Sequence, residues 1–377
     1  MRKGFLILLS FILFFGCASK ETIRPDNTNS TPVSEVELII SYSEAPSVTP
    51  MATDAPATVA PTDAPTDTPV PTDTPEPTQP PKPYVAEDGV YTIAWISDPQ
   101  HYSAKFPELY DSMTLFLRDH REELQLAYIM HTGDLVNKTS DDAQWKVASK
   151  AQSYIDEIPN GVLAGNHDCQ DPDGFQPYSR YFGESRYKDR EWYGGSYKDN
   201  RGHYDLLTIG NTDYLFVYMS YGPDSGCIKW LNKVFAEYPD RIGFLLLHDY
   251  FEQDLQRSKA GKKLYQQVVL NHPNIYFVLC GHRYGAYRQS EQIDDDQDGT
   301  PDHTLYEMMF NYQAAGKVGG DGYLRLLQVN EKEGTMHMLT YSPNLDDFNR
   351  FDDPANREKR YELDETAEEF LIPIPWL

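Results

Sequence analysis

Five short segments rich in metal-ligand residue types constrain the fold of this chain more than any other feature. In chain order they are Asp98-Pro99-Gln100, Gly133-Asp134, Gly165-Asn166-His167-Asp168, His248 and Gly281-His282. Most of them directly follow an apolar run that is typical of a buried strand, which would place their side chains beyond the carboxyl ends of the strands of a sheet. Carboxylate, amide oxygen and imidazole together suit hard-to-borderline cations, and the whole set is large enough to hold two metal ions.

The alternation of strand-like and helical patterns predicts an α/β fold with two sheets packed face to face and helices outside. The expected strands cover residues 91–97, 126–131, 161–164, 203–209, 214–219, 242–247, 275–280, 287–293, 305–310, 323–329 and 335–341. The expected helices cover residues 107–121, 141–158, 227–238 and 259–270, the second of them capped by Ser140 or Asp141. From Asp168 to about residue 200 the chain reads as irregular, and residues 192–196 read as a turn.

The first 17 residues have the pattern of a secretory signal. Arg2 and Lys3 precede an apolar run over residues 5–15 that is too short to span a membrane, and Cys17 follows. The sequence from Leu13 to Ala18 resembles a bacterial lipoprotein processing site, which implies cleavage before Cys17 and acylation of its thiol. An uncleaved membrane anchor and an ordinary cleaved signal are the alternatives. With a lipid on Cys17, we expect the protein on the extracellular face of the bacterial cell membrane.

Residues 18–84 form a Thr-, Pro- and Asp-rich stretch with repeated Thr-Asp-Ala-Pro and Thr-Asp-Thr-Pro units. Such a composition buries too little apolar surface to offset the entropy of ordering, so we expect a disordered linker. The folded part then consists of a domain over residues 85–345 and a C-terminal extension over residues 346–377. The extension ends in the apolar run from Phe370 to Leu377, which we expect to pack back on the domain as an edge strand.

The charge of the chain limits its partners. It carries 33 basic and 58 acidic residues, a net charge of −25, which opposes a broad nucleic-acid interface. The same charge disfavours contact with an anionic membrane except through a lipid anchor, and we expect a monomer. Besides Cys17, three cysteines remain, an odd number that gives no disulfide framework. A Cys169–Cys280 bridge and buried free thiols are both open.

The five segments suggest how two cations could be held. Asp134 is the best candidate for a shared carboxylate, and Asn166 offers an amide oxygen without adding charge. His248 and His282 can complete one site as neutral imidazoles. The simplest account is metal-assisted hydrolysis, in which two cations lower the pKa of a bridging water and offset charge on a phosphoryl group.

His167 is the candidate for proton transfer. It follows Asn166 directly, so it would lie close to the metals and still be free to donate a proton or a hydrogen bond to the leaving oxygen. Asp168 is expected to orient the His167 ring.

These residues resemble the motifs of the calcineurin-like metallophosphoesterase superfamily: Asp-x-His, Gly-Asp, Gly-Asn-His-Asp/Glu, a lone His and Gly-His-x-His. The resemblance extends over about residues 91–342. It implies a four-layer α/β/β/α sandwich of two mixed β-sheets flanked by helices, with a dinuclear site of Mn, Fe or Zn. It assigns Asp98 and Asp134 to the first metal and His167 to catalysis. For the second metal it implies Asp134, Asn166, His248 and His282.

Two departures from the family pattern concern the ligands of the first metal. Gln100 stands where the family has its first histidine, although His101 follows, and Tyr284 stands where it has its last. A phenol is a poorer ligand than an imidazole near neutral pH. We therefore expect one tight metal site and one weaker site.

A second acidic cluster lies between two late strands. Asp294, Asp296, Asp298 and Asp302 alternate with other residues, and Gly299 stands at the sixth position, as at the start of a calcium loop. Leu305 occupies the twelfth position, where an EF-hand has Glu. Calcium binding and a plain acidic turn are both open.

Together these features predict a metal-dependent phosphoesterase that hydrolyses a small phosphate mono- or diester. The alternative is a phosphoesterase scaffold with weakened catalysis that acts as a surface binding protein. Tyr102, Trp145, Trp192, Tyr193 and Tyr250 lie near the motifs and are either cleft or packing residues.

Overall fold

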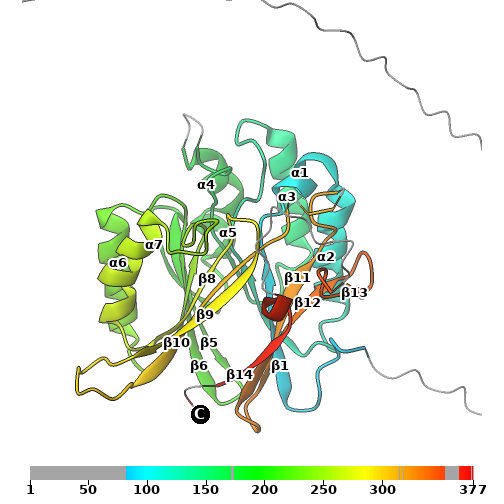
Figure 1. Cartoon of the computed structure of the whole chain (residues 1–377). Helices are drawn as coiled ribbons and strands as arrows, with labels where there is room; N and C mark the ends of the chain where they lie inside the picture. The colour runs from blue at the N-terminus through cyan, green and yellow to red at the C-terminus, as the bar shows by residue number, and fades with distance from the viewer. Residues whose placement is uncertain are drawn as a thin grey trace, which may run out of the picture. The chain divides into compact units, whose positions relative to one another are not determined.

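Two seven-stranded β-sheets pack face to face in the computed structural model (Figure 1). The structure describes residues 82–170, 174–313, 315–316, 318–352, 365–374 and 376. The signal and lipidation site expected at Cys17, and the linker up to residue 81, lie outside these residues.

Sheet A has the strand order β13–β12–β11–β1–β2–β3, and β14 pairs with the same strand β12 as β13 does. Its strands are β1 (Val90–Ile96), β2 (Leu126–His131), β3 (Asn160–Val162), β11 (Leu324–Asn330), β12 (Thr335–Ser342), β13 (Asp347–Phe348) and β14 (Phe370–Pro373). β1, β2 and β3 run parallel to one another, whereas β11 pairs antiparallel with β1.

Sheet B has the strand order β4–β5–β6–β7–β8–β10–β9. Its strands are β4 (Tyr193–Tyr197), β5 (Gly202–Ile209), β6 (Thr212–Met219), β7 (Ile242–Leu247), β8 (Ile275–Cys280), β9 (Gly285–Ile293) and β10 (His303–Asn311). β6, β7, β8 and β10 are parallel, and hairpins at both edges make the sheet mixed.

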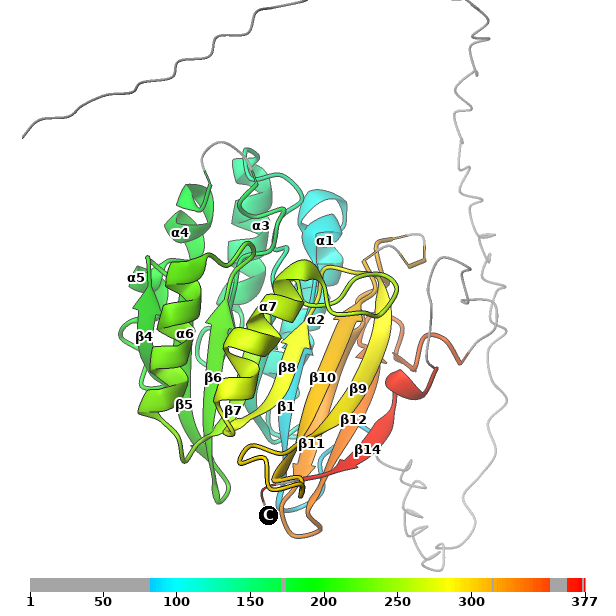
Figure 2. The same ribbon diagram turned by 60° about the vertical axis from the view of Figure 1, so that its left-hand side comes forward.

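Helices cover the outer faces of both sheets (Figures 1 and 2). The helices are α1 (Gln100–Lys105), α2 (Pro107–Asp119), α3 (Asp142–Ser153), α4 (Gln176–Phe182), α5 (Glu184–Tyr187), α6 (Ser225–Glu237) and α7 (Lys259–Gln267), with short 3-10 turns at Val269–Asn271 and Glu365–Ala367. α1 to α5 lie on the side of sheet A, and α6 and α7 lie against sheet B.

Three apolar layers hold these elements together. The central layer lies between the sheets and includes Trp95, Tyr128, Phe216 and Phe244. One outer layer joins sheet A to its helices, and the other joins sheet B to α6 and α7. Three apolar layers separate four layers of structure, so the predicted α/β/β/α sandwich of two mixed sheets is confirmed.

Two parts of the sequence-based prediction were wrong. Residues 192–196 were expected to be a turn, but β4 pairs with the edge of β5 there. The glycines that suggested a turn are required by packing instead, because a Cβ on Gly194 would lie 2.1 Å from the ring of Tyr204. The stretch expected to be irregular up to residue 200 contains α4 and α5, and the short helix α1 was also missed.

The C-terminal segment closes one end of the sandwich. β14 pairs antiparallel with β12 and is visible beside it in Figure 2. Trp376 then lies edge-on to Tyr214 and Phe277 of sheet B, with ring centroids 6.1 and 5.9 Å away. Its indole nitrogen donates to Thr212 Oγ1 at 3.4 Å.

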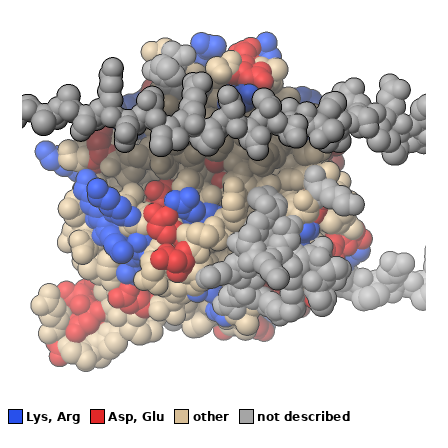
Figure 3. Space-filling model, turned by 45° about the horizontal axis from the view of Figure 1, so that its top comes forward, with Lys and Arg blue, Asp and Glu red and all other residues tan. Residues whose placement is uncertain are grey.

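Figure 3 shows both signs of charge on the face that it presents. A stripe of basic side chains lies on the side where Figure 1 places α6 and α7, and acidic side chains lie next to it. Those helices carry the exposed residues Lys229, Lys233, Lys259, Lys262 and Lys263. In the part of the chain that the structure describes, no helix has both the length and the apolar character to cross a membrane.

Candidate metal centre

The candidate site lies at one edge of the sandwich, where parallel strands from both sheets end. Asp98 follows β1, Asp134 follows β2 and Asn166 follows β3, all in sheet A. His248 follows β7 and His282 follows β8, both in sheet B. Because the carboxyl ends of parallel strands meet at one edge, residues far apart in the chain come together here.

Three of these residues have left-handed backbone conformations. The φ angles are 53° at Asp98, 55° at Asp134 and 70° at His282. Such conformations cost free energy for residues other than glycine and are concentrated at functional sites. Here they turn each side chain back toward the junction of the two sheets.

Two motif glycines are needed because carboxylates pack against them. A Cβ on Gly165 would lie 2.1 Å from Asp134 Oδ1, and a Cβ on Gly281 would lie 2.1 Å from Asp98 Oδ2. Real Cβ atoms essentially never approach another atom more closely than 3.0 Å. Glycine is therefore required at both positions by the acidic residue that it contacts.

Asp98, Asp134 and His248 form the core of the site. Each is buried, and each offers a ligand atom within 4.8 Å of the other two. His248 Nε2 lies 3.3 Å from Asp134 Oδ1 and 3.0 Å from Asn166 Oδ1. The structure thus brings atoms of Asp134, Asn166 and His248 to one point, as their motifs predicted.

His282 lies beside this cluster. Its ring centroid is 4.9 Å from that of His248, and its backbone nitrogen donates to Asp98 Oδ1 at 3.1 Å. Burial lowers the pKa of His282 to about 3, so the imidazole is neutral near pH 7, as a metal ligand must be.

The electrostatics of the cluster favour added positive charge. Burial raises the pKa of Asp98 to about 8, against the attraction of His248 and with repulsion from Asp134. Burial alone would also raise the pKa of Asp134, but the charge and hydrogen bond of His248 lower it. Burial disfavours a charged His248, yet Asp134 and Asp98 raise its pKa to about 10. Near pH 7 the protonated imidazole thus balances the charge of Asp134 while Asp98 holds its own proton, and a cation that binds there would take the place of these protons.

The donor set fits a divalent metal. Gln100 donates from Nε2 to Asp134 Oδ2 at 3.0 Å, while its Oε1 is buried with no hydrogen-bond partner among the residues that the structure describes. A buried acceptor without a partner is costly unless something fills that role, and a cation near Asp98 and Asp134 would do so. Tyr284, by contrast, is 37 % exposed, and its backbone pairs with Gln253.

His167 is held at the rim of the cluster and is half-buried. Its backbone nitrogen donates to Asp134 Oδ1 at 3.0 Å. Its ring Nδ1 lies 3.0 Å from the carbonyl oxygen of Asn137, which can only accept, so Nδ1 carries a proton.

The expected role of Asp168 was wrong. Its carboxylate accepts backbone N–H groups of Leu135, Val136 and Gly165 at 3.0, 3.0 and 2.8 Å, whereas the His167 ring is oriented by Asn137. Burial and the neighbouring Asp134 raise the pKa of Asp168 to about 7. Asp168 holds together the two loops that carry Asp134 and His167.

Sequence reasoning missed His131 and Thr132, which join the parts of the site just before Gly133. His131 Nδ1 accepts from Gly133 N at 3.1 Å, and its Nε2 lies 3.1 Å from Tyr110 Oη. Thr132 O pairs with His248 Nδ1 at 2.8 Å, and Gly133 O accepts from Asp98 N at 3.2 Å. The only signal in the sequence was a buried-looking histidine at the end of an apolar strand.

Sequence reasoning also missed Tyr221, whose ring lies 6.1 Å from that of His248 and 5.8 Å from that of His282. The aromatic residues that the sequence suggested as either cleft or packing residues have packing positions. Tyr102, Trp145 and Tyr250 are buried, and Trp192 and Tyr193 pack against the core.

Cys169, Cys227 and Cys280 are free thiols, so the Cys169–Cys280 bridge does not form. Burial raises the pKa of the Cys169 thiol to about 12, which makes it unreactive near neutral pH.

The acidic loop lies between β9 and β10, and none of its residues belongs to the five segments. Carboxylate oxygens of Asp294, Asp296 and Asp302 lie within 4.8 Å of one another. Asp294 already accepts from Gly299 N at 2.8 Å and from Asp298 N at 3.1 Å. Both the calcium loop, with Asp298 among its ligands, and the acidic turn remain predictions.

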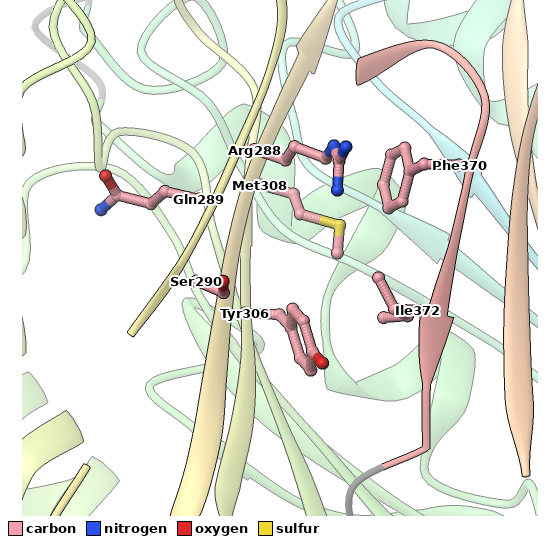
Figure 4. Close-up of a pocket in the computed structure, with 7 residues that line it drawn as sticks. All are labelled: Arg288, Gln289, Ser290, Tyr306, Met308, Phe370 and Ile372. Atoms are coloured by element: carbon pink, nitrogen blue, oxygen red, sulfur yellow. The ribbon is translucent and has the colours of Figure 1, made fainter. Parts of the chain in front are cut away.

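Two hollows are relevant to ligands. One, of about 270 Å³, is lined by His167 and by the loop that begins at Asn137. The other, of about 220 Å³, lies between β9–β10 and β14, and Figure 4 shows Arg288, Tyr306 and Phe370 around it. None of the residues that line this second hollow belongs to the five segments. The first hollow, which His167 lines, is therefore the better candidate for binding a substrate.

Comparison with known proteins agrees with this geometry. Residues 91–284 match the family model described as calcineurin-like phosphoesterase. The uncharacterized protein YvnB of Bacillus subtilis (strain 168) is 41 % identical over 266 residues, which are 70 % of this chain and 21 % of that protein. This chain thus spans about a fifth of the length of that relative.

A solved structure shows the same fold. The purple acid phosphatase PPD1 from yellow lupin (Lupinus luteus) seeds superposes with a TM-score of 0.51 at 11 % identity, covering 78 % of this chain and 55 % of that one. At this identity the likeness concerns the fold alone.

Proposed function

Because this chain belongs to the calcineurin-like phosphoesterase family, whose members hydrolyse phosphate esters, we propose that it is a metal-dependent phosphoesterase acting on a small phosphate mono- or diester. The observation that carries the proposal is the convergence on His248 Nε2, which lies 3.0 Å from Asn166 Oδ1 and 3.3 Å from Asp134 Oδ1. A purely structural hydrogen-bond network among these three groups would not require the second buried carboxyl group, Asp98, that lies beside them.

The family uses divalent metals, and Mn, Fe or Zn suit the donors present here. Asp98, Gln100 and Asp134 would hold the first ion. Asp134, Asn166, His248 and His282 would hold the second, and more tightly, because this set contains two imidazoles. When bound, such ions lower the pKa of water and offset charge on a phosphoryl group.

His167 then supplies the proton for the leaving oxygen. Its Nδ1 hydrogen is committed to the Asn137 carbonyl at 3.0 Å, which fixes the ring plane and leaves Nε2 for the substrate. As an imidazolium, the ring gives up the Nε2 proton while the Nδ1 hydrogen bond stays in place. The link from the His167 nitrogen to Asp134 keeps this acid at the edge of the cluster.

One observation favours a second candidate function, a surface binding protein with weakened catalysis. The first ion has an amide at Gln100 instead of an imidazole, and Tyr284 is 37 % exposed in place of the last histidine. A scaffold that keeps one ion could bind a phosphate group without turning it over.

The test combines metal analysis with turnover. The protein is loaded with Mn, Fe or Zn and assayed with nitrophenyl phosphate mono- and diesters. We expect one tight and one weaker ion, and activity that is lost in His167→Ala and Asp134→Ala. His337→Ala, which replaces a half-buried histidine on β12 outside the site, is the matched control and should remain active. A folded protein without turnover in any metal would support the binding protein, and two equally tight ions would contradict the assignment of unequal sites.

We also propose that the protein is displayed on the outer face of the cell membrane through a lipid on Cys17. The proposal is supported by the basic, apolar and cysteine pattern of residues 1–17. Labelled palmitate should appear on the full chain and disappear with Cys17→Ala. Equal labelling of both would refute it.

A further inference from the structure

We propose that the hollow beside His167 binds the alcohol part of the substrate, and that it selects a small hydrophilic alcohol with an anionic substituent. This inference rests on the phosphoesterase function proposed above and names the class of its substrate. The hollow has a volume of about 270 Å³, below the roughly 300–1,000 Å³ of pockets that bury a drug-sized ligand. It is lined by Asn137, Lys138, Thr139, Ser140, His167 and Gln170.

The position of His167 ties this hollow to the leaving group. A general acid must lie within hydrogen-bond reach of the oxygen that it protonates, about 2.6–3.2 Å. His167 is joined to the metal cluster through Asp134 and to the wall of the hollow through Asn137. An ester whose phosphoryl group lies at the cluster and whose leaving oxygen meets His167 therefore directs its alcohol into the hollow.

The wall of the hollow is preorganised by helix α3. Gln144 Oε1 accepts the backbone N–H groups of Asn137 and Lys138 at 2.9 and 3.1 Å. Trp145 Nε1 donates to Thr139 O at 2.8 Å. Asp141 caps the helix by accepting from Ala143 N at 3.1 Å. A loop fixed in this way pays little entropy when a ligand binds.

The chemistry of the lining selects the alcohol. Every lining side chain is polar, whereas ligand pockets are usually lined mostly by apolar and aromatic groups. An aromatic or alkyl alcohol would bury no apolar wall there, while hydroxyl groups would find donors and acceptors.

Lys138 adds a preference for negative charge. It is exposed, and it forms no ion pair with any residue in the described ranges. It is the one lining residue with a permanent positive charge, so a carboxylate or second phosphate on the alcohol would pair with it.

Three phosphomonoesters of similar size and leaving-group basicity test the proposal: 3-phosphoglycerate, glycerol 3-phosphate and propyl phosphate. We expect kcat/KM to fall in that order at low ionic strength. The carboxylate should give a preference of roughly two- to fivefold over glycerol 3-phosphate, which is the range for an exposed ion pair. Lys138→Ala should abolish that preference and Lys138→Glu should invert it. Lys146→Ala, an exposed lysine on α3 that pairs with Asp142, is the matched control and should keep it.

The outcomes separate the two proposals. Turnover of all three esters with the same preferences in wild type and Lys138→Ala would overturn the subsite and leave the phosphoesterase function standing. Faster turnover of propyl phosphate than of glycerol 3-phosphate would also overturn it. No turnover of any ester would overturn the phosphoesterase function, and the subsite with it.

Discussion

Replacing Gly165 with alanine tests whether the metal centre depends on the contact between the Gly165 backbone and Asp134. The new Cβ would lie 2.1 Å from Asp134 Oδ1 and 2.5 Å from the Asp134 nitrogen. The nitrogen is backbone, and the carboxylate is buried and held by hydrogen bonds from His167 N and Gln100 Nε2. Asp134 would have to retreat until its oxygen is at least 3.0 Å away. Catalytic groups must be held within about 0.5 Å of their working positions, so this shift is large enough to matter.

The expected losses follow from that displacement. A misplacement of about 1 Å can cost roughly 100-fold in rate, and disturbed support of a ligand typically costs about 10- to 100-fold in metal affinity. Overpacking should lower the free energy of unfolding by about 1–3 kcal/mol. Calorimetric titration of the metal-free protein with Mn or Zn measures the affinity, and kcat/KM with nitrophenyl phosphate measures the rate.

Gly334→Ala is the matched control. Gly334 has a φ of 66°, and in the described part of the chain no atom lies within 4 Å of its would-be Cβ, so alanine there costs about 1–2 kcal/mol of backbone strain. It lies in the turn between β11 and β12, outside the site. A Gly165→Ala protein that binds metal as tightly as wild type, or a control that loses as much affinity, would refute the reasoning.

Three further predictions follow from named contacts. His131→Asn should weaken metal binding by about 10- to 100-fold, because the support of Gly133 is lost, while Tyr110→Phe, which removes only the outer partner of His131, should have a smaller effect in the same titration. Burial lowers the pKa of His203 to about 3 in the folded protein, below the usual 6.5. As the pH falls, the unfolded chain therefore binds a proton at this histidine before the folded protein does. The stability that the neutral histidine contributes is complete above pH 6.5 and is lost as the pH drops toward 3. Between pH 6 and 4 the free energy of unfolding of wild type should therefore fall by about 1.4 kcal/mol per pH unit more than that of His203→Phe, measured by urea denaturation. Calcium should raise the melting temperature of wild type but not of Asp294→Asn if the acidic loop binds it, whereas a melting temperature that ignores calcium in both proteins identifies a plain turn.

The sequence predicted the parts of the fold in which local pattern and burial agree. Strands β1, β7 and β8, which are buried over almost their whole length, are nearly continuous apolar runs, and a capping Asp141 marks the start of α3. β4 was missed because its two glycines are typical of turns, and the reason for them, the ring of Tyr204, lies on another strand. Local pattern cannot report a contact of that kind.

The candidate site divides in the same way. The sequence predicted which residues meet, because each motif follows a predicted strand and the carboxyl ends of parallel strands lie at one edge of a sheet. It did not predict that Asp168 would bind three backbone N–H groups instead of orienting His167, since a carboxylate can serve either role. Nor did it predict the part played by His131, whose partners come from α2 and from the loop after its own strand.

The two sheets contribute different halves of the site, and hydrogen bonds already cross between them. His248 of sheet B reaches Thr132 of sheet A, and the His282 backbone reaches Asp98. The two layers are thus fastened to each other at the metal centre itself, and a shear of one sheet over the other would pull the ligands out of alignment. The opposite end is fastened as well, because Tyr91 Oη of sheet A lies 2.7 Å from Tyr214 Oη of sheet B, and Glu331 accepts from Thr212 Oγ1 at 2.7 Å. Engineering that loosens or enlarges the interior therefore has to keep cross-sheet hydrogen bonds at both ends.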